Sequence, residues 1–498
     1  MTASTRARTS PAPATPHDPA GSTARGALWL ATNGIVVKAA HTVVLLTLAA
    51  LLTPSALGLV ALGSLVANVA AILGTLGTAS ALVHLEGSTQ RVERAARTAL
   101  TLGLVTSSAL AALLWATAPL LASSLRADDG GAAVIRGLTV VLPCLAVAGV
   151  TTELLRRRLA FARRIVPDTV SAVVGAVVAI ALVTQGVGVM ALVAGQVTQA
   201  VLMMLLAWVV HRPVLPGWDR ADARALVSFG VPFSGAHLLE VVQLNLDYLL
   251  VARVLGALAL GHYSLSYRIA NMPYLMVAVV VTGAAFPYLC RARGADRARA
   301  AEVALGVTFS LMLPACLLLA LLADDLVLLG AEWAPATPVL ALLAGYALLL
   351  ALLQVCLTVL NAAGRPGVAM AVRLVHLLVL GLTLLVVVER GIVSVALAQV
   401  VVVGAVALPA LALARRAVPG TSAARLGADV RPALVASVAM AIAVLALRGL
   451  DPVAGGGVLA LGATTLVAVL VFLVVLRAVG ADAWRAVLEL LRRREVLA

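Results

Sequence analysis

The feature that most constrains this chain is a series of long apolar runs, separated by short turns that contain Gly, Pro, Asp and Arg. About twenty apolar residues in a helix cross the hydrocarbon core of a bilayer. The chain is 62% hydrophobic, above the roughly 45–50% of ordinary soluble domains, so a soluble fold is excluded. The fourteen predicted spans are 26–51, 58–83, 98–122, 132–154, 166–184, 187–210, 226–250, 262–289, 302–322, 336–360, 367–388, 391–413, 433–448 and 456–477.

Charge separates the turns into two alternating sets. One set, every second turn together with the two ends of the chain, holds 28 of the 36 basic residues. The turns between them hold only five arginines, together with seven acidic residues. Positive charge marks cytoplasmic loops, so we predict that both termini are cytoplasmic. Topology also accounts for the net charge of +14, and nucleic-acid binding is therefore not predicted.

A short motif recurs between the two halves of the chain. Gly58 and Asn68 correspond to Gly261 and Asn271, at an offset of 203 residues in both cases (261 − 58 and 271 − 68). Each copy connects the first span of a six-span half to its second span. Six spans restore the original orientation, so the halves are predicted to be parallel repeats, an arrangement typical of transporters with a substrate path between the halves.

These patterns predict an all-α, polytopic transmembrane fold of about 14 helices, in which two six-helix lobes are related by a parallel pseudo-repeat and two C-terminal helices follow. The predicted parts are a disordered cytoplasmic tail at 1–25, lobes at 26–210 and 226–413, two extra helices at 433–477, and an amphipathic cytoplasmic tail at 478–498.

Three stretches resemble the oligosaccharide-lipid (polysaccharide biosynthesis) flippase family of the multidrug/oligosaccharidyl-lipid/polysaccharide exporter superfamily. They are LLTPSALGLVAL at 51–62, LDYLLVARVLGALALGHYSLSYRIANMP at 246–273 and NAAGRPG at 361–367. The resemblance covers about 26–413. It implies a multi-pass protein of the bacterial inner (plasma) membrane, which moves an undecaprenyl-pyrophosphate-linked glycan from the inner to the outer leaflet by alternating access.

The same resemblance implies no catalytic residues. The four cysteines fall inside apolar runs without a CxxC pair, so no metal site is predicted, and no cofactor is predicted either. The partners that the resemblance implies are the lipid bilayer and glycan polymerases or glycosyltransferases of the same pathway. Two other functions remain open from the sequence. A cation-coupled multidrug exporter of this superfamily would normally stop at twelve spans, and a membrane glycan polymerase or ligase would need a large outer loop.

Three basic residues within the predicted spans are candidates for the substrate path. Arg373 lies in the inner part of its span, Lys38 near the middle and Arg268 toward the outer end. Ionisable groups at such depths usually face a cavity or a partner, and a pyrophosphate crossing the membrane needs cations to offset its desolvation. Pro273, one turn beyond Arg268, is a candidate hinge because proline removes a helical hydrogen bond.

A structural interpretation of these charges is also open. Asp247 could pair with Arg268 and Glu240 with Lys38, judged by depth alone, or the two carboxylates could couple transport to an ion. Three histidines within the spans are either packing residues with hydrogen bonds or members of the same coupling group: His41, His237 and His376.

Overall fold

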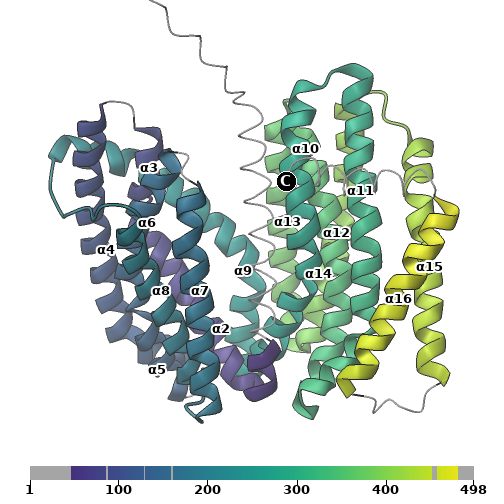
Figure 1. Cartoon of the computed structure of the whole chain (residues 1–498), viewed down its shortest axis with the longest axis horizontal. Coiled ribbons are helices and arrows are strands. Elements are labelled where there is room, and N and C mark those ends of the chain that lie inside the picture. Colours follow the sequence, from purple (N-terminus) through teal and green to yellow (C-terminus); the bar gives the residue numbers. More distant parts are fainter. Residues whose placement is uncertain (1–45, 86–87, 128, 159–160, 451–456, 481–498) are drawn as a thin grey trace, which may run out of the picture.

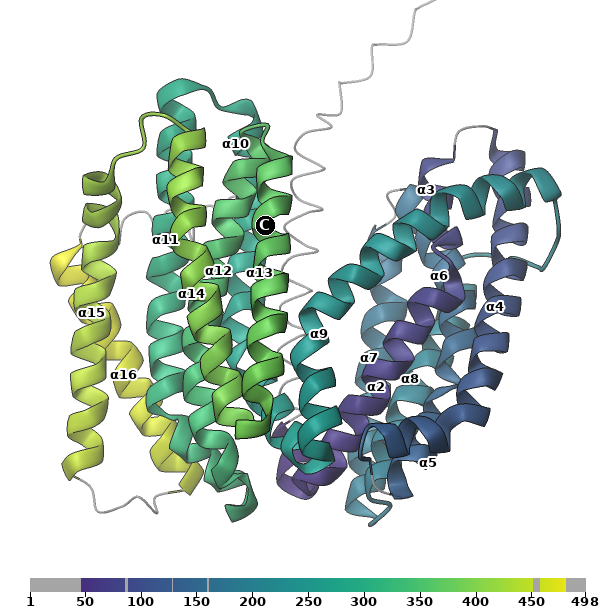
Figure 2. The same ribbon diagram turned by 180° about the vertical axis from the view of Figure 1, so that it is seen from behind.

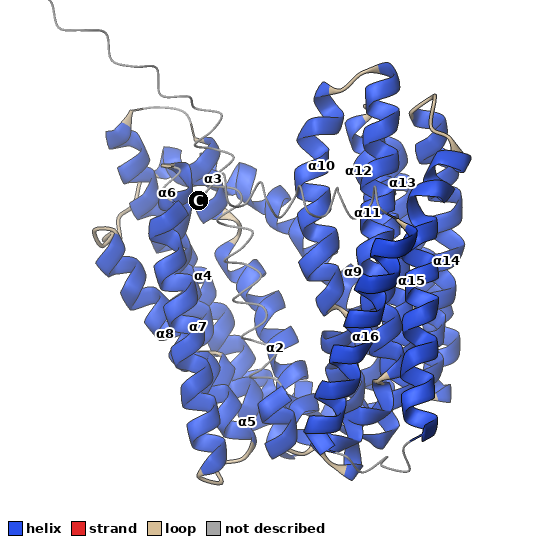
Figure 3. Ribbon diagram, turned by 45° about the vertical axis from the view of Figure 1, so that its right-hand side comes forward, coloured by secondary structure: helices blue, strands red, loops and turns tan. Residues whose placement is uncertain are grey.

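A computed structural model describes residues 46–85, 88–127, 129–158, 161–450 and 457–480. The regular elements in these ranges are all helical (Figure 3), and twelve helices among them are long and apolar enough to cross a membrane. The prediction of an all-α polytopic fold is therefore confirmed. The first predicted span, 26–51, lies largely outside the described residues.

The N-terminal lobe contains seven described helices, which stand side by side as a bundle (Figure 1). The first of them begins with a proline preceded by Thr53, whose hydroxyl accepts a hydrogen bond from the backbone N–H of Ala56, a favourable helix start. The helices are α2 (Pro54–Thr75), α3 (Thr78–His84), α4 (Thr89–Ser124), α5 (Asp129–Leu138), α6 (Val141–Arg157), α7 (Phe161–Thr184) and α8 (Val189–Val210).

The C-terminal lobe follows, and the last two helices pack on its side away from the first lobe (Figure 1). The lobe comprises α9 (Arg220–Ala270), a π-helical turn (Tyr274–Ala278), α10 (Val279–Arg291), α11 (Gly294–Leu321), two 3-10 segments (Ala323–Leu329 and Ala331–Ala336), α12 (Thr337–Ala362), α13 (Pro366–Val387), a 3-10 turn (Val388–Arg390) and α14 (Ile392–Ala417). The additional pair is α15 (Ala423–Leu450) and α16 (Gly457–Val479).

Helix α9 joins the two lobes. It starts against α3 and α4 of the first lobe and runs down into the second (Figure 2). Asp219 caps its N-terminus, and the hydrogen bond from the backbone of Asp222 lowers the pKa of the Asp219 carboxyl. At Gly256 the backbone takes a non-helical conformation (φ 86°, ψ −178°). The predicted spans 226–250 and 262–289 therefore lie on either side of a real break within α9.

The two lobes meet where the two copies of the repeated motif cross, one on α2 and the other on α9. A Cβ atom on Gly58 of α2 would lie 1.8 Å from the carbonyl oxygen of Ala257, and one on Gly261 of α9 would lie 1.8 Å from the carbonyl oxygen of Pro54. Both contacts pair equivalent positions of the repeat, since Pro54 and Ala257 are also 203 residues apart (257 − 54). We call this contact of Gly58 and Gly261 the glycine crossing. It is pseudo-symmetric, and it requires residues without side chains at both positions.

Further contacts join the lobes around the glycine crossing. Arg126 donates to the carbonyl oxygen of Val254 at 2.8 Å, and Arg253 donates back to the carbonyl oxygen of Ser124. The indole N–H of Trp333 donates to the backbone of Ala49 at 3.0 Å. The helices of the two lobes lie close together at the end with the glycine crossing. They diverge toward the opposite end, which carries the arginine-rich turns (Figures 1 and 2).

The membrane orientation is a prediction that reporter fusions can check. We expect fusions after residue 94 and after residue 498 to report the cytoplasm and one after residue 129 to report the outside, because arginine-rich turns stay in the cytoplasm. Opposite sides for residues 94 and 498 would contradict both the orientation and the even number of spans.

Candidate functional site

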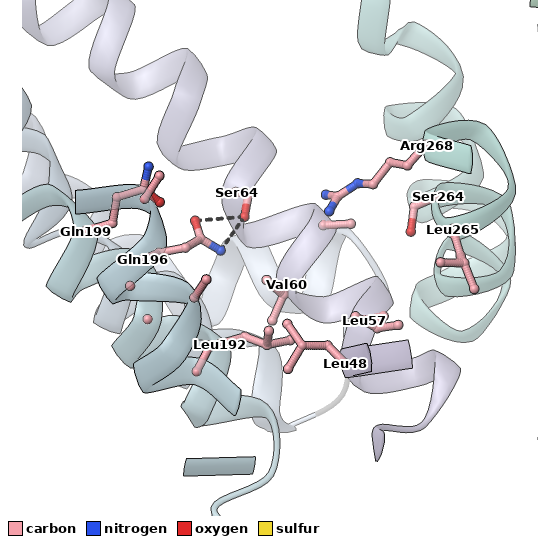
Figure 4. A pocket seen from close by; sticks show the side chains of 16 residues that line it. Leu48, Leu57, Val60, Ser64, Leu192, Gln196, Gln199, Ser264, Leu265 and Arg268 are labelled. Carbon is pink, nitrogen blue, oxygen red and sulfur yellow. Dashed lines mark hydrogen bonds between the residues drawn. The ribbon is translucent and has the colours of Figure 1, made fainter. Parts of the chain in front are cut away.

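A cavity of about 390 Å³ lies between the two lobes, immediately beside the glycine crossing. Helices α2, α7 and α8 of the N-terminal lobe form most of its wall, and the last turns of α9 close it from the C-terminal lobe (Figure 4). The lining is mainly Leu, Val, Ala and Gly, with five polar side chains: Ser64, Gln196, Gln199, Ser264 and Arg268. The site is therefore an apolar chamber with a few polar groups, as is usual for ligand pockets.

Among the residues that the structure describes, Arg268 is the one basic residue that lines this cavity. Its guanidinium extends from α9 across the chamber toward Ser64 (Figure 4). The side chain is exposed, and none of the described carboxylates lies within ion-pair distance of it. A guanidinium without a carboxylate partner is a ready site for a phosphate or carboxylate.

The opposite wall presents hydroxyl and amide groups to the chamber. Ser64 and Gln196 are joined by side-chain hydrogen bonds of 3.0–3.1 Å (Figure 4). Helices α7 and α8 pack closely here, because a Cβ on Gly175 would lie 2.6 Å from the carbonyl oxygen of Gly195. Small residues permit such approach between membrane helices. The polar groups of this wall are thus held on tightly packed helices.

Asp247 lies outside the cavity lining, inside the C-terminal lobe. It is 2% exposed, and its carboxylate accepts hydrogen bonds from the Tyr263 hydroxyl at 2.7 Å, the Gln399 amide at 2.9 Å and the Tyr248 backbone N–H at 2.9 Å. The described residues show no ion pair between Asp247 and Arg268, so the pairing that depth suggested is not observed. Three donors supply the stabilisation that a buried carboxylate needs.

Arg373 and His376 lie on α13 and do not line the cavity. Arg373 donates to the side-chain oxygen of Gln354 at 3.2 Å, and the Gln354 amide donates to the Tyr274 hydroxyl at 3.1 Å. His376 is 5% exposed, and its Nε2 has no hydrogen-bond partner in the described part of the chain. Of the predicted residues Arg268, Arg373 and His376, only Arg268 therefore lines the cavity.

The remaining predicted residues keep their roles as predictions. Lys38 and His41 lie outside the described residues, and the side chain of Glu240 on α9 is also outside them. His237 is exposed on α9. Pro273 directly precedes the π-helical turn, so the helix geometry changes at the predicted hinge, as is common at functional bends.

The cavity also contains residues that the sequence analysis did not select. Ser64, Gln196 and Gln199 are uncharged, and a search for ionisable groups in apolar runs passes over them. The available signal was a polar group of residues, Gln196, Thr198 and Gln199, within an apolar span, with the two glutamines about one helical turn apart. Within the described ranges, no three His, Cys, Asp or Glu residues are grouped in a way that could hold a metal ion.

The role of Asp247 is open to a direct test. Asp247→Leu is expected to destabilise the protein, because each buried donor left without an acceptor costs about 1–3 kcal/mol. Thermal unfolding in detergent should show a clear fall, with Asp247→Asn closer to the wild type because it keeps one acceptor oxygen. An unchanged unfolding temperature with lost transport would instead indicate the coupling role.

Comparison with known proteins gives one family match. The model of the family described as polysaccharide biosynthesis protein matches residues 47–338, more than half of the 498-residue chain. The matched region includes both copies of the repeated motif and all sixteen cavity-lining residues.

Two curated relatives resemble parts of the chain. The succinoglycan biosynthesis transport protein ExoT of Rhizobium meliloti (strain 1021) is 30% identical over 308 residues, 60% of this chain and 60% of that protein. The teichuronic acid biosynthesis protein TuaB of Bacillus subtilis (strain 168) is 31% identical over 196 residues, 38% of this chain and 40% of that protein. The chain thus matches less than two thirds of the length of either relative.

Two solved structures share the fold. The lipid II flippase MurJ in an inward closed conformation aligns with a TM-score of 0.73 at 12% identity and covers 92% of this chain and 98% of that one. An inward-facing transporter of the multidrug resistance MATE family, from the MOP superfamily, aligns with a TM-score of 0.54 at 18% identity and covers 81% and 95%. These likenesses support the two-lobe architecture.

Proposed function

Because the chain belongs to the polysaccharide biosynthesis protein family, we propose that it is a flippase for a polyprenyl-pyrophosphate-linked oligosaccharide or cell-wall precursor. It moves this lipid from the inner to the outer leaflet of a bacterial cell membrane, with both of its termini in the cytoplasm. The names of the two curated relatives, one a succinoglycan transport protein and one a teichuronic acid biosynthesis protein, support a glycan as the cargo.

The observation that carries this proposal is Arg268 in the cavity between the lobes. A pyrophosphate loses its hydration when it enters an apolar chamber, and this loss is prohibitive without compensating charge. Arg268 has no carboxylate partner among the described residues and lies opposite hydroxyl and amide groups, so it supplies charge-assisted hydrogen bonds to phosphate oxygens. A cationic drug would meet repulsion at the same place, so the charge favours an anionic cargo over a multidrug role.

The lobe contacts support alternating access as the mechanism. The lobes are joined at the end that bears the glycine crossing and diverge at the end that bears the arginine-rich turns. With those turns in the cytoplasm, this arrangement receives cargo from the inner leaflet. Release to the outer leaflet then requires the glycine crossing to separate while the cytoplasmic ends approach.

Other predicted residues enter the proposal in secondary roles. Lys38 and Arg373 extend the series of cations along the path, and Pro273 acts as a hinge at the change of helix geometry. Glu240, with the histidines His41, His237 and His376, forms the candidate coupling group. Asp247 has a structural role, since its hydrogen bonds to Tyr263 and Gln399 occupy its carboxylate.

The test of this function uses purified protein in liposomes. A labelled polyprenyl-pyrophosphate glycan, placed in the inner leaflet, should become accessible to a membrane-impermeant glycosidase only when the protein is present. The same lipid without its pyrophosphate should cross more slowly, because the Arg268 contact is lost. Export of a cationic dye in place of the glycan lipid would assign the protein to the multidrug class, and sugar transfer by clean protein would make it an enzyme.

A further inference from the structure

A second cavity, of about 430 Å³, lies in the N-terminal lobe at the end that carries the arginine-rich turns. The start of α4, the end of α6 and the connection between α8 and α9 surround it. Its volume falls within the roughly 300–1,000 Å³ of small-molecule pockets. Four arginines and one acidic residue line it: Arg97, Arg157, Arg158, Arg212 and Glu93.

The pocket arginines differ from their neighbours in making no ion pair with a carboxylate of the described residues. Arg94 lies 3.1 Å from Asp222, and Arg156 lies 3.4 Å from Glu153. None of the four arginines that line the pocket makes an ion pair with a described carboxylate. Several positive charges of one sign that share a cavity favour a bound anion.

The walls of this pocket are held in place by hydrogen bonds. Arg157 donates a hydrogen bond to the carbonyl oxygen of Leu82 at 2.7 Å, and this bond holds the end of α6 against α3. The α8–α9 connection is fixed to α4, since the Thr101 hydroxyl and the backbone of Gly217 are bonded in both directions at 2.8–2.9 Å. Arg97, Arg158 and Arg212 are exposed, which leaves them available to a ligand.

The position of the pocket separates it from the cavity between the lobes. Both ribbon views place the α8–α9 connection at the edge of the N-terminal lobe that is farthest from the C-terminal lobe (Figures 1 and 2). Leu215 and Trp218 of this connection are 66% and 63% exposed. Tryptophan is enriched at headgroup level in membranes, so this edge faces lipid at the membrane surface.

We propose that this pocket binds the phosphate of an anionic phospholipid from the leaflet on the side of the arginine-rich turns, through Arg97, Arg158 and Arg212. Basic pockets between membrane helices on the cytoplasmic side recognise such headgroups. The buried side chains of Val92 and Leu154 form an apolar part of the lining. The bound lipid is a fixed neighbour of the N-terminal lobe and not the transported cargo.

The experiment measures retention of phosphatidylglycerol against phosphatidylcholine by native mass spectrometry of the full chain. The wild type should retain phosphatidylglycerol selectively. The double variant Arg97→Gln with Arg212→Gln should lose at least about tenfold in this selectivity, because each basic group at the membrane surface contributes about 1 kcal/mol. The single variant Arg158→Gln should show a smaller loss in the same direction, which secures the result if the double variant folds poorly.

The matched control is Arg156→Gln, which changes an adjacent arginine of α6 that is paired with Glu153 and should keep the wild-type selectivity. Equal retention by the wild type and the double variant would overturn the proposal. So would displacement of the lipid by inorganic phosphate at millimolar concentration, which would identify a soluble anion as the ligand. Loss of binding of the polyprenyl-pyrophosphate glycan in the double variant would also overturn it, by placing the pocket on the substrate path.

Discussion

Arg268→Ala is expected to lower flipping of a polyprenyl-pyrophosphate glycan by about tenfold to a hundredfold, since a hydrogen bond to a charged group contributes about 1.5–3 kcal/mol. The protein should remain folded and inserted, because Arg268 is exposed in the cavity and holds no described carboxylate in place. Initial flipping rates in proteoliposomes and thermal unfolding of the same preparation measure the two effects separately.

Two further variants make this result specific. Arg268→Lys should retain part of the rate, because charge survives while the bidentate geometry of the guanidinium is lost. Arg390→Ala removes an exposed arginine that does not line the cavity and should leave flipping unchanged. A wild-type rate in Arg268→Ala would contradict the role of Arg268 in the substrate path.

The general architecture was predictable because bilayer thickness and loop charge leave few alternatives. Apolar runs of fixed length give the helices, and the offset of 203 residues between Gly58 and Gly261 predicts the two lobes. The structure adds that each of these glycines contacts the backbone of the other lobe. This contact explains why both copies of the repeat have glycine at the same position. A short motif was therefore a better guide to the lobe interface than hydrophobicity.

The side-chain partners were not predictable, because depth in the membrane does not fix the direction in which a helical residue points. Asp247 and Arg268 can be placed at one level from sequence, yet Asp247 turns into the lobe toward Gln399, 152 positions further along the chain. Arg373 similarly bonds Gln354 of the neighbouring helix α12. Such choices depend on how helices rotate against one another, which a single sequence does not reveal.

Gly58→Ala and Gly261→Ala are expected to separate the lobes at the glycine crossing. Each new methyl group would lie 1.8 Å from a backbone carbonyl oxygen of the other lobe, and a backbone cannot move aside as a side chain can. Overpacking of this kind costs about 1–3 kcal/mol, enough to shift a two-state equilibrium by roughly fivefold to a hundredfold. Ser264→Cys, at a position that is buried beside the crossing, should then react faster with an impermeant thiol reagent added outside.

The repeat makes this prediction unusually specific, because two residues 203 positions apart must have the same effect. The double variant should be labelled little faster than either single variant. Once one alanine has separated the lobes, the other alanine no longer clashes with the opposing backbone. Gly345→Ala is the matched control, because a Cβ at this helical glycine meets nothing within 4 Å, and it should leave both labelling and flipping unchanged. Labelling at the wild-type rate in both single variants would contradict a role for the crossing as the outer contact of alternating access. An effect of only one glycine would show that the two halves move unequally.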